Sequence, residues 1–521
     1  MIRFRISIAT LACVANLEAQ VANSFMMTTS STSPLPPSNT FNKIVPSGDT
    51  LWVGTGKGLS LTTNAGMSWL RMSTAETFDE KGVSAIAKRG DQAWVATAFT
   101  TTHENESIQT GHGLHVSSDR GKTWRFIPQP VDTRKVDTLI YGRNKIPALA
   151  ITVPEQNITY DIALTRTDVW IASWGGMLRK SSNNGNTWQR VILPPDNLDH
   201  IAPTDTLRFA LSNVNKFFEK DPLYNKDTLR ASLNHVMFSL HVSDDSTIWV
   251  GTANGINKST DNGISWTKFN HQNQLRAISG NFVVAITEQS WKSKRYIWAA
   301  TNNAVDPDEK RGVSFSQDGG STWSTSLLGE FTHDVAARDS LVYVAADGGL
   351  YRSDDFGTSW TRSGTIFDPS TLQRFASPIV YGIGLKGDTV WVGGPDGLAY
   401  TIDSPAQPFG TTWKVFRTYQ QVTSTGSTYS YPLPFSPTSE VVRIHYALSE
   451  ASSQVTIRIF DFAMQPVRTL LQNAARRGSA EHDEIWDGRD DLSRRVANGV
   501  YFYRVEIGDS SPQWGKILVL Q

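Results

Sequence analysis

One pattern recurs seven times between residues 41 and 417 of this 521-residue chain, and it constrains the fold more than any other feature. Each copy opens with a short β-branched run around one aromatic residue, at 51–55, 93–97, 169–172, 248–252, 297–301, 342–345 and 390–393. A glycine followed by a hydrophobic residue comes next, at Gly58, Gly113, Gly176, Gly255, Gly312, Gly349 and Gly397. A polar turn of the form S/T-x-D/N-x-G-x-S/T-W closes the copy, at 62–69, 117–124, 181–188, 259–266, 316–323 and 353–360. In the seventh copy, an insertion interrupts the turn between Thr401 and Trp413.

Tryptophan marks both the opening strand and the turn, and it indicates how the copies pack. Six tryptophans lie in the opening strands and seven follow the turns, out of 17 in the chain. A few short strands cannot bury both faces of their own sheet, so each copy must stack on its neighbours. Indole rings supply large apolar area for that contact. The repeat therefore predicts an array of similar, stacked β-sheets.

The turn carries a recurring carboxylate or amide side chain, which we interpret as structural. Such a side chain accepts hydrogen bonds from backbone N–H groups of its own turn, and the following glycine adopts a backbone conformation that other residues resist. A catalytic or metal site needs each group once, whereas this group returns in every copy. The structural set is Asn64, Asp119, Asn183, Asp261, Asp318, Asp355 and Asp403.

The polar turn resembles the Asp box, or BNR repeat, of sialidases, sortilin-like receptors and xyloglucanase-like glycosidases. The resemblance is specific because six good copies and one degenerate copy stay in register with seven aromatic strands. It covers residues 41–417 and implies a seven-bladed β-propeller in which each blade is a four-stranded antiparallel meander.

Residues 435–521 differ from the repeats and resemble a FlgD-like immunoglobulin domain, as well as type IX secretion sorting domains. The resemblance rests on alternating strands, on Trp486-Asp487-Gly488-Arg489-Asp490 and on Asn498-Gly499-Val500-Tyr501-Phe502-Tyr503. Gln465 departs from the glycine that is usual in the family. We therefore expect an all-β chain: a seven-bladed β-propeller, a linker at 418–434, and a small C-terminal Ig-like β-sandwich. The resemblance implies that this last domain engages secretion machinery.

The N-terminal 19 residues have the composition of a secretory signal peptide. Arg3 and Arg5 precede an apolar run that is too short to span a membrane, and cleavage is expected before Gln20. A lipoprotein anchor at Cys13 is an alternative that the sequence leaves open. A leader segment rich in Ser, Thr and Pro follows at 20–40. We expect a secreted or cell-surface protein without a membrane span.

Charge and cysteine content exclude several classes of partner. Lys+Arg and Asp+Glu both number 49, so the net charge is zero, whereas nucleic acids and anionic membranes attract basic surfaces. A single cysteine allows neither an intrachain disulfide nor a cysteine-based zinc site. We expect a monomer that binds no nucleic acid and needs no metal or cofactor.

Long insertions interrupt the repeats where a four-stranded meander places its connections on one face. The segments 99–112, 128–156, 193–234 and 302–311 all fall between strands 2 and 3 or between successive blades. Long loops on a rigid scaffold usually carry binding, so this loop-rich face, opposite the Asp boxes, is the predicted ligand side. The candidate ligand-binding residues on it are Trp174, His112, Glu104, Arg134, Tyr224 and His235.

Two of these loops carry further expectations. Trp174 lies in a turn where the repeat requires no aromatic, so its indole either stacks on a sugar ring or covers its own blade. In the 193–234 insertion, helical spacing predicts a helix that Asp205 or Thr206 would cap. Its apolar positions are Leu207, Ala210, Leu211, Val214, Phe217 and Phe218.

The sequence favours an exported bacterial propeller that binds a glycan or a protein on the loop-rich face and is delivered by its C-terminal domain. A sialidase-like or other glycoside hydrolase is the alternative, but catalytic residues cannot be assigned: no carboxylate pair is evident, and nothing shows that three arginines converge. The arginines on or near this face are Arg134, Arg143, Arg208, Arg276 and Arg374. A structural surface protein without catalysis is the third reading.

Overall fold

The computed structural model describes residues 24–26, 31–33, 36–72, 78, 81–103, 106–133, 138–214, 230–371, 373–375, 377–417, 428–431, 433–438, 441–448, 452–477 and 481–520. The predicted signal peptide and Cys13 lie outside these residues. Within them, strands dominate, and the one helical element is the short 3₁₀ helix η1 (Leu233–His235). The predicted all-β class is confirmed.

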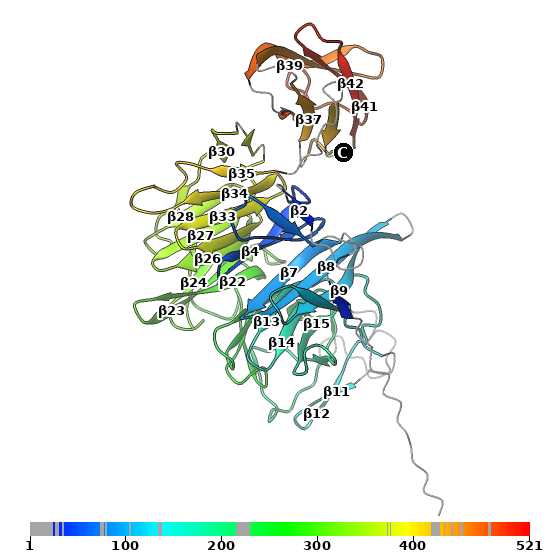
Figure 1. Ribbon diagram of the computed structural model, residues 1–521. Coiled ribbons are helices and arrows are strands. Elements are labelled where there is room, and N and C mark those ends of the chain that lie inside the picture. The colour runs from blue at the N-terminus through cyan, green and yellow to red at the C-terminus, as the bar shows by residue number, and fades with distance from the viewer. Residues whose placement is uncertain are drawn as a thin grey trace, which may run out of the picture.

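Seven antiparallel meanders of similar build follow one another along the described part of the chain (Figure 1). Blades 1 to 3 consist of β3 (Phe41–Ser47), β4 (Thr50–Thr55), β5 (Gly58–Thr62) and β6 (Trp69–Arg71); β7 (Gly82–Arg89), β8 (Gln92–His103), β9 (Glu106–Ser117) and β10 (Thr123–Pro128); and β13 (Thr159–Leu164), β14 (Val169–Ser173), β15 (Met177–Ser181) and β16 (Gln189–Arg190). Blades 4 and 5 consist of β18 (Met237–Val242), β19 (Ile248–Thr252), β20 (Gly255–Ser259) and β21 (Trp266–Phe269); and β22 (Phe282–Trp291), β23 (Lys294–Asn302), β24 (Gly312–Ser316) and β25 (Ser324–Ser326). Blades 6 and 7 consist of β26 (Thr332–Arg338), β27 (Leu341–Ala346), β28 (Gly349–Ser353) and β29 (Thr361–Arg362); and β32 (Gly382–Lys386), β33 (Thr389–Gly394), β34 (Gly397–Ile402) and β35 (Lys414–Phe416).

The first strands of the blades close a ring. Each one contacts the first strand of the next blade, in the order β3, β7, β13, β18, β22, β26 and β32, and β32 in turn contacts β3. Each sheet thus packs between two others, as the short tryptophan-rich strands require. The predicted β-propeller is confirmed.

The polar turns hold themselves together through their own carboxylates. In blade 4, Asp261 accepts hydrogen bonds from the backbone N–H of Ser265 at 2.9 Å and from the Ser265 hydroxyl at 2.6 Å, while Ser259 donates to it at 2.7 Å. In blade 6, the equivalent hydrogen bonds lower the pKa of Asp355 to about 2. The bonds from Ser359 have the largest effect, followed by the bond from Ser353. These groups are occupied by their own turns.

Asp403 does not occupy the equivalent position in blade 7. Its carboxylate accepts hydrogen bonds from the Tyr343 hydroxyl and from Arg352 Nε, the latter at 2.6 Å, so it joins blade 7 to blade 6. The insertion after Asp403 displaces this residue from the turn, and Thr401 instead bonds to the carbonyl oxygen of Thr412 at 2.7 Å. The expectation that Asp403 closes a turn of its own is therefore corrected.

Glycines of the polar turns press against tryptophans of the preceding blade. Gly263 has φ +83°, and a Cβ atom on it would lie 2.4 Å from the Trp170 ring. The strand tryptophan of one blade meets the turn tryptophan of the next edge-on, as Trp52 and Trp124 do with ring centres 6.2 Å apart. Close approach and aromatic contact together fix the spacing between blades.

The described strands reach beyond the predicted propeller boundaries. β1 (Ser24–Met26) and β2 (Ser31–Ser33), in the segment predicted as a leader, pair with β10 and β6 as fifth outer strands. β17 (His200–Ile201) adds a fifth strand to blade 4, while β11 (Thr138–Tyr141) with β12 (Asn144–Pro147), and β30 (Phe367–Asp368) with β31 (Gln373–Arg374), form separate hairpins.

The predicted helix in the 193–234 insertion is wrong over its described part. Residues 205–214 contain no helix, and 215–229 lie outside the described residues. Leu211 donates its N–H to the carbonyl oxygen of Pro147 at 2.8 Å and accepts from the N–H of Leu149 at 3.0 Å. Phe209, Ala210 and Leu211 are consecutive and all buried. Their segment hydrogen-bonds to the neighbouring segment 147–149 instead of forming the internal hydrogen bonds of a helix.

The C-terminal strands form two sheets around their own core. One sheet consists of β36 (Thr428–Tyr431), β37 (Val442–Ala447) and β40 (Glu481–Trp486), and the other of β39 (Pro466–Arg477), β38 (Ser452–Phe460), β41 (Gly499–Ile507) and β42 (Gln513–Val519). Both sheets contribute buried residues such as Trp486 and Tyr503. β36 begins inside the predicted linker. Asp396 of blade 7 pairs with Arg417 and with Arg443 of β37, so a buried ionic contact joins the module to the propeller.

Candidate functional site: a cavity on the loop-rich face

Inner strands of the propeller share an irregularity near their first residues. In six of the seven described ones, the pairing register shifts around the second or third residue of the strand. A β-bulge of this kind turns a side chain away from its normal direction and often lies beside a functional site. The residues at the shifts are Asn42, Ser84, Tyr160, Phe238, Val284 and His333.

Three of these bulged residues, Asn42, Ser84 and Tyr160, line one cavity of about 820 Å³. We call it the mouth cavity. It lies where the inner strands of blades 1, 2 and 3 begin, and the projecting β8–β9 hairpin supplies a further wall (Figure 1). Its volume is typical of a site for a small organic ligand. The lining residues are Asn42, Gly56, Lys81, Gly82, Val83, Ser84, Ala98, Phe99, Thr100, Gln109, Ile158 and Tyr160.

The lining of the mouth cavity combines aromatic surface with neutral hydrogen-bonding groups. Phe99 and Tyr160 present rings, Asn42 and Gln109 present amides, and Ser84 and Thr100 present hydroxyls. Lys81 supplies the one charged side chain of the lining, and its ammonium lies 4.3 Å from the centre of the Phe99 ring. Such a surface can stack on an apolar ring face while it exchanges hydrogen bonds with several hydroxyl groups.

Trp174 does not line this cavity, but it belongs to an aromatic cluster that includes the lining residue Tyr160. The Phe238 ring is 5.6 Å from the Tyr160 ring and 5.6 Å from the Trp174 ring, and it also contacts Phe282 at 4.2 Å. Trp174 is 39% exposed, whereas Phe238 is buried. The indole is therefore held by neighbouring rings and still presents surface to solvent.

The other predicted ligand residues lie elsewhere. His112 is half-buried behind Phe99, bonded to Thr97 Oγ1 at 3.0 Å, and supports the base of the β8–β9 hairpin. His235 is fully buried between the carbonyl oxygens of Ser212 and Leu193, and burial lowers its pKa to about 4. It is thus closed off from a ligand. Glu104, Arg134 and Tyr224 fall outside the described residues.

Three charged side chains at the inner strands escaped the sequence analysis. Lys43, Asp161 and Asp334 each follow a bulge, at the position where other blades have Ala85, Ser239 and Ala285. An alignment of the repeat copies at this position would have revealed them, because a charged residue in three copies contrasts with a small residue in three others.

The positive charge of Lys43 partly compensates the negative charges of Asp161 and Asp334. Asp161 accepts the N–H of Leu240 in the next blade at 2.8 Å, and Asp334 likewise accepts the N–H of Ile383 at 3.0 Å. Burial raises the pKa of both carboxyl groups, against the opposing charge of Lys43. Burial lowers the pKa of Lys43, but the two carboxylates outweigh it and raise this pKa overall. The cluster therefore links adjacent blades below the mouth cavity.

The arginines proposed for a sialidase-like site do not line the mouth cavity. Arg143, Arg208, Arg276 and Arg374 are all exposed, and none belongs to its lining. Arg134 lies outside the described residues.

Comparison with known proteins gives likenesses of structure. No protein-family model and no curated protein matches this sequence. YCF48 from Cyanidioschyzon merolae is 18% identical, with 71% of this chain and 98% of that chain covered and a TM-score of 0.43. A GH74 enzyme of Niastella koreensis is 12% identical over 94% and 74% of the two chains, with a TM-score of 0.47. PorZ, a surface component of the type IX secretion system of Porphyromonas gingivalis, is 15% identical over 93% and 60%, with a TM-score of 0.33. At these scores the likenesses assign no activity to this chain.

Membrane insertion through a helix finds no support in the described residues. None of their helical segments has the length and apolar character needed to cross a bilayer.

Proposed function

We propose that this chain is an exported bacterial protein whose seven-bladed, Asp-box β-propeller binds a glycan in the mouth cavity. The C-terminal β-sandwich, as a FlgD-like or sorting domain, delivers it to the cell surface or the medium. The observation that carries the proposal is the lining of the cavity: two aromatic rings, two amides and two hydroxyls around about 820 Å³.

Each part of that lining suits a sugar. The rings of Tyr160 and Phe99 offer faces on which the C–H side of a pyranose can stack, and the amides of Asn42 and Gln109 can each donate and accept. The Asn42 side chain has no hydrogen bond within the described part of the chain, so its amide is available to a ligand. The bulges that present Asn42 and Tyr160 lie on rigid strands, which limits the entropy lost on binding.

A glycan array tests this function. The full chain is expected to bind a restricted set of glycans, and Asn42→Ala is expected to weaken that binding at least tenfold. Trp174→Ala should weaken it as well, without lowering the unfolding temperature, because the indole is partly exposed. Binding constants by calorimetry on the best array ligand provide the measurement.

Trp514→Ala is the matched control. Trp514 is 45% exposed, close to the 39% of Trp174, but it lies on the C-terminal sandwich. Its loss should leave glycan binding unchanged. An array without hits, together with retention of a protein partner in a pull-down, would replace the glycan by a protein ligand. Hydrolysis of the bound glycan would favour the glycoside-hydrolase alternative.

A further inference from the structure

A cationic residue recurs two positions after the turn tryptophan in four blades. The four cations share one register, because each lies opposite the same position of the third strand of its blade. They are Arg71, Arg190, Lys268 and Arg362. Because the blades are structural copies, the surroundings of these four side chains can be compared directly.

In blades 1, 3 and 4 the cation bonds to oxygen atoms of a segment that folds over the blade. The acceptors are the carbonyl of Pro36 for Arg71, the carboxylate of Asp132 and the carbonyl of Leu149 for Arg190, and the carbonyls of Pro195 and Asp196 for Lys268. This position of the blade therefore holds a cation together with an oxygen acceptor above it.

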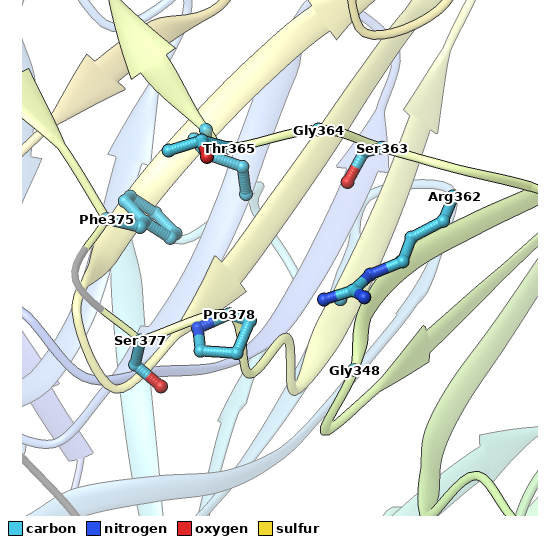
Figure 2. Close-up of a pocket in the computed structure, with 10 residues that line it drawn as sticks. Gly348, Arg362, Ser363, Gly364, Thr365, Phe375, Ser377 and Pro378 are labelled. Atoms are coloured by element: carbon cyan, nitrogen blue, oxygen red, sulfur yellow. The ribbon is translucent and has the colours of Figure 1, made fainter.

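Arg362 in blade 6 has no such acceptor. Its guanidinium makes no hydrogen bond or ion pair within the described part of the chain, and it faces a cavity of about 390 Å³ between blade 6 and the segment 363–378 that leads to blade 7. In Figure 2 the side chain extends into the space between the 363–365 backbone and Pro378. Glu330 approaches the Gly348 edge of this space, but it is engaged by the Tyr351 hydroxyl.

The remaining lining fits a compact organic acid. Ser363 and Thr365 add hydroxyl groups to the lining, while Ile366, Phe375 and Pro378 add apolar surface. A planar guanidinium pairs with a carboxylate through two parallel hydrogen bonds. Gly349 also lines the cavity, and its φ of +129° is a backbone conformation that favours glycine.

We propose that this cavity beside blade 6 binds a small carboxylate-bearing ligand, whose carboxylate takes the place of the internal oxygen acceptor found in blades 1, 3 and 4. The ligand is either a sugar acid or a small aromatic or aliphatic acid, which share this carboxylate. The site is separate from the mouth cavity and does not depend on glycan binding there.

Calorimetric titration of the full chain tests the site, with D-glucuronate and benzoate as acids and with glucose and benzyl alcohol as their neutral counterparts. At least one acid is expected to bind, and its neutral counterpart at least tenfold more weakly. Arg362→Gln should weaken acid binding at least tenfold, and Arg362→Lys less. Which acid binds distinguishes the two sources of the carboxylate.

Two further variants distinguish loss of the binding site from a general change in surface charge or in folding. Arg374→Gln removes a nearby exposed charge that does not line the cavity, and it should leave binding unchanged. Gly364→Leu keeps Arg362 but fills the cavity without backbone strain, since a Cβ atom there meets nothing within 4 Å, and it should abolish binding. Failure of both acids to bind, or equal binding by wild type and Arg362→Gln, would overturn the proposal. Asn42→Ala should leave this binding intact, whatever it does to glycans.

Discussion

Acidification from pH 7 to pH 5 is expected to lower the free energy of unfolding by about 6 kcal/mol, through three largely buried histidines. Burial, with a smaller contribution from the neighbouring His112, lowers the pKa of His115 to about 3, and burial lowers the pKa of His235 and of His241 to about 4. All three start from an ordinary value of 6.5. Below pH 6.5 these histidines therefore become protonated in the unfolded chain but stay neutral in the folded chain. The free energy of unfolding falls as the pH falls. Each histidine contributes about 2 kcal/mol at pH 5.

Urea titrations at half-unit intervals between pH 7 and pH 4.5 measure this slope. The loss should continue to about pH 4 for His235 and His241 and to about pH 3 for His115. His115→Phe, which keeps a ring against Phe78, should remove about a third of the slope below pH 6. A stability that does not change between pH 7 and pH 5 would show that these imidazoles are not held neutral.

Replacing Lys43 with methionine is expected to destabilise the propeller by about 3 kcal/mol at pH 7.5, because two partly buried carboxylates lose their counter-charge. Asp161 and Asp334 would then repel each other while each still holds the N–H of a neighbouring blade. Without Lys43, the pKa of both carboxyl groups rises further above the unfolded value. The penalty is therefore largest at neutral pH and shrinks as the pH falls towards the folded pKa.

The difference in unfolding free energy between wild type and Lys43→Met, measured at pH 7.5 and at pH 5, isolates this effect from the histidines. Lys57→Met is the control, since Lys57 is exposed in a turn of the same blade. A penalty equal at both pH values, or equal to that of the control, would mean that the charges at the inner strands do not balance one another.

The repeat made the propeller predictable from sequence, because strand, glycine, turn and tryptophan return at fixed intervals. Asp403 was wrongly assigned to a turn because Thr401 and Asp403 keep the spacing of the pattern, whereas the insertion that follows moves Asp403 out of the turn. The helix at 205–218 failed for a different reason: apolar residues at helical spacing also suit an extended segment that buries consecutive side chains, as Phe209, Ala210 and Leu211 do.

The candidate site was predicted less completely than the fold. Meander geometry fixes which connections share a face, and the sequence therefore pointed to Trp174, which the structure links to the lining residue Tyr160 through Phe238. Sequence could not show that His235 would be buried, because polar loop residues look alike whether covered or exposed. Asn42 and Tyr160 were missed because their direction depends on β-bulges, which leave no simple mark in the sequence.

A crystal structure of the full chain with its best array ligand tests the central claim most directly. The account predicts the glycan in the mouth cavity, with one sugar ring against Tyr160 and hydrogen bonds to Asn42 and Gln109. A ligand bound on the face that carries the polar turns, or on the C-terminal sandwich, would contradict it.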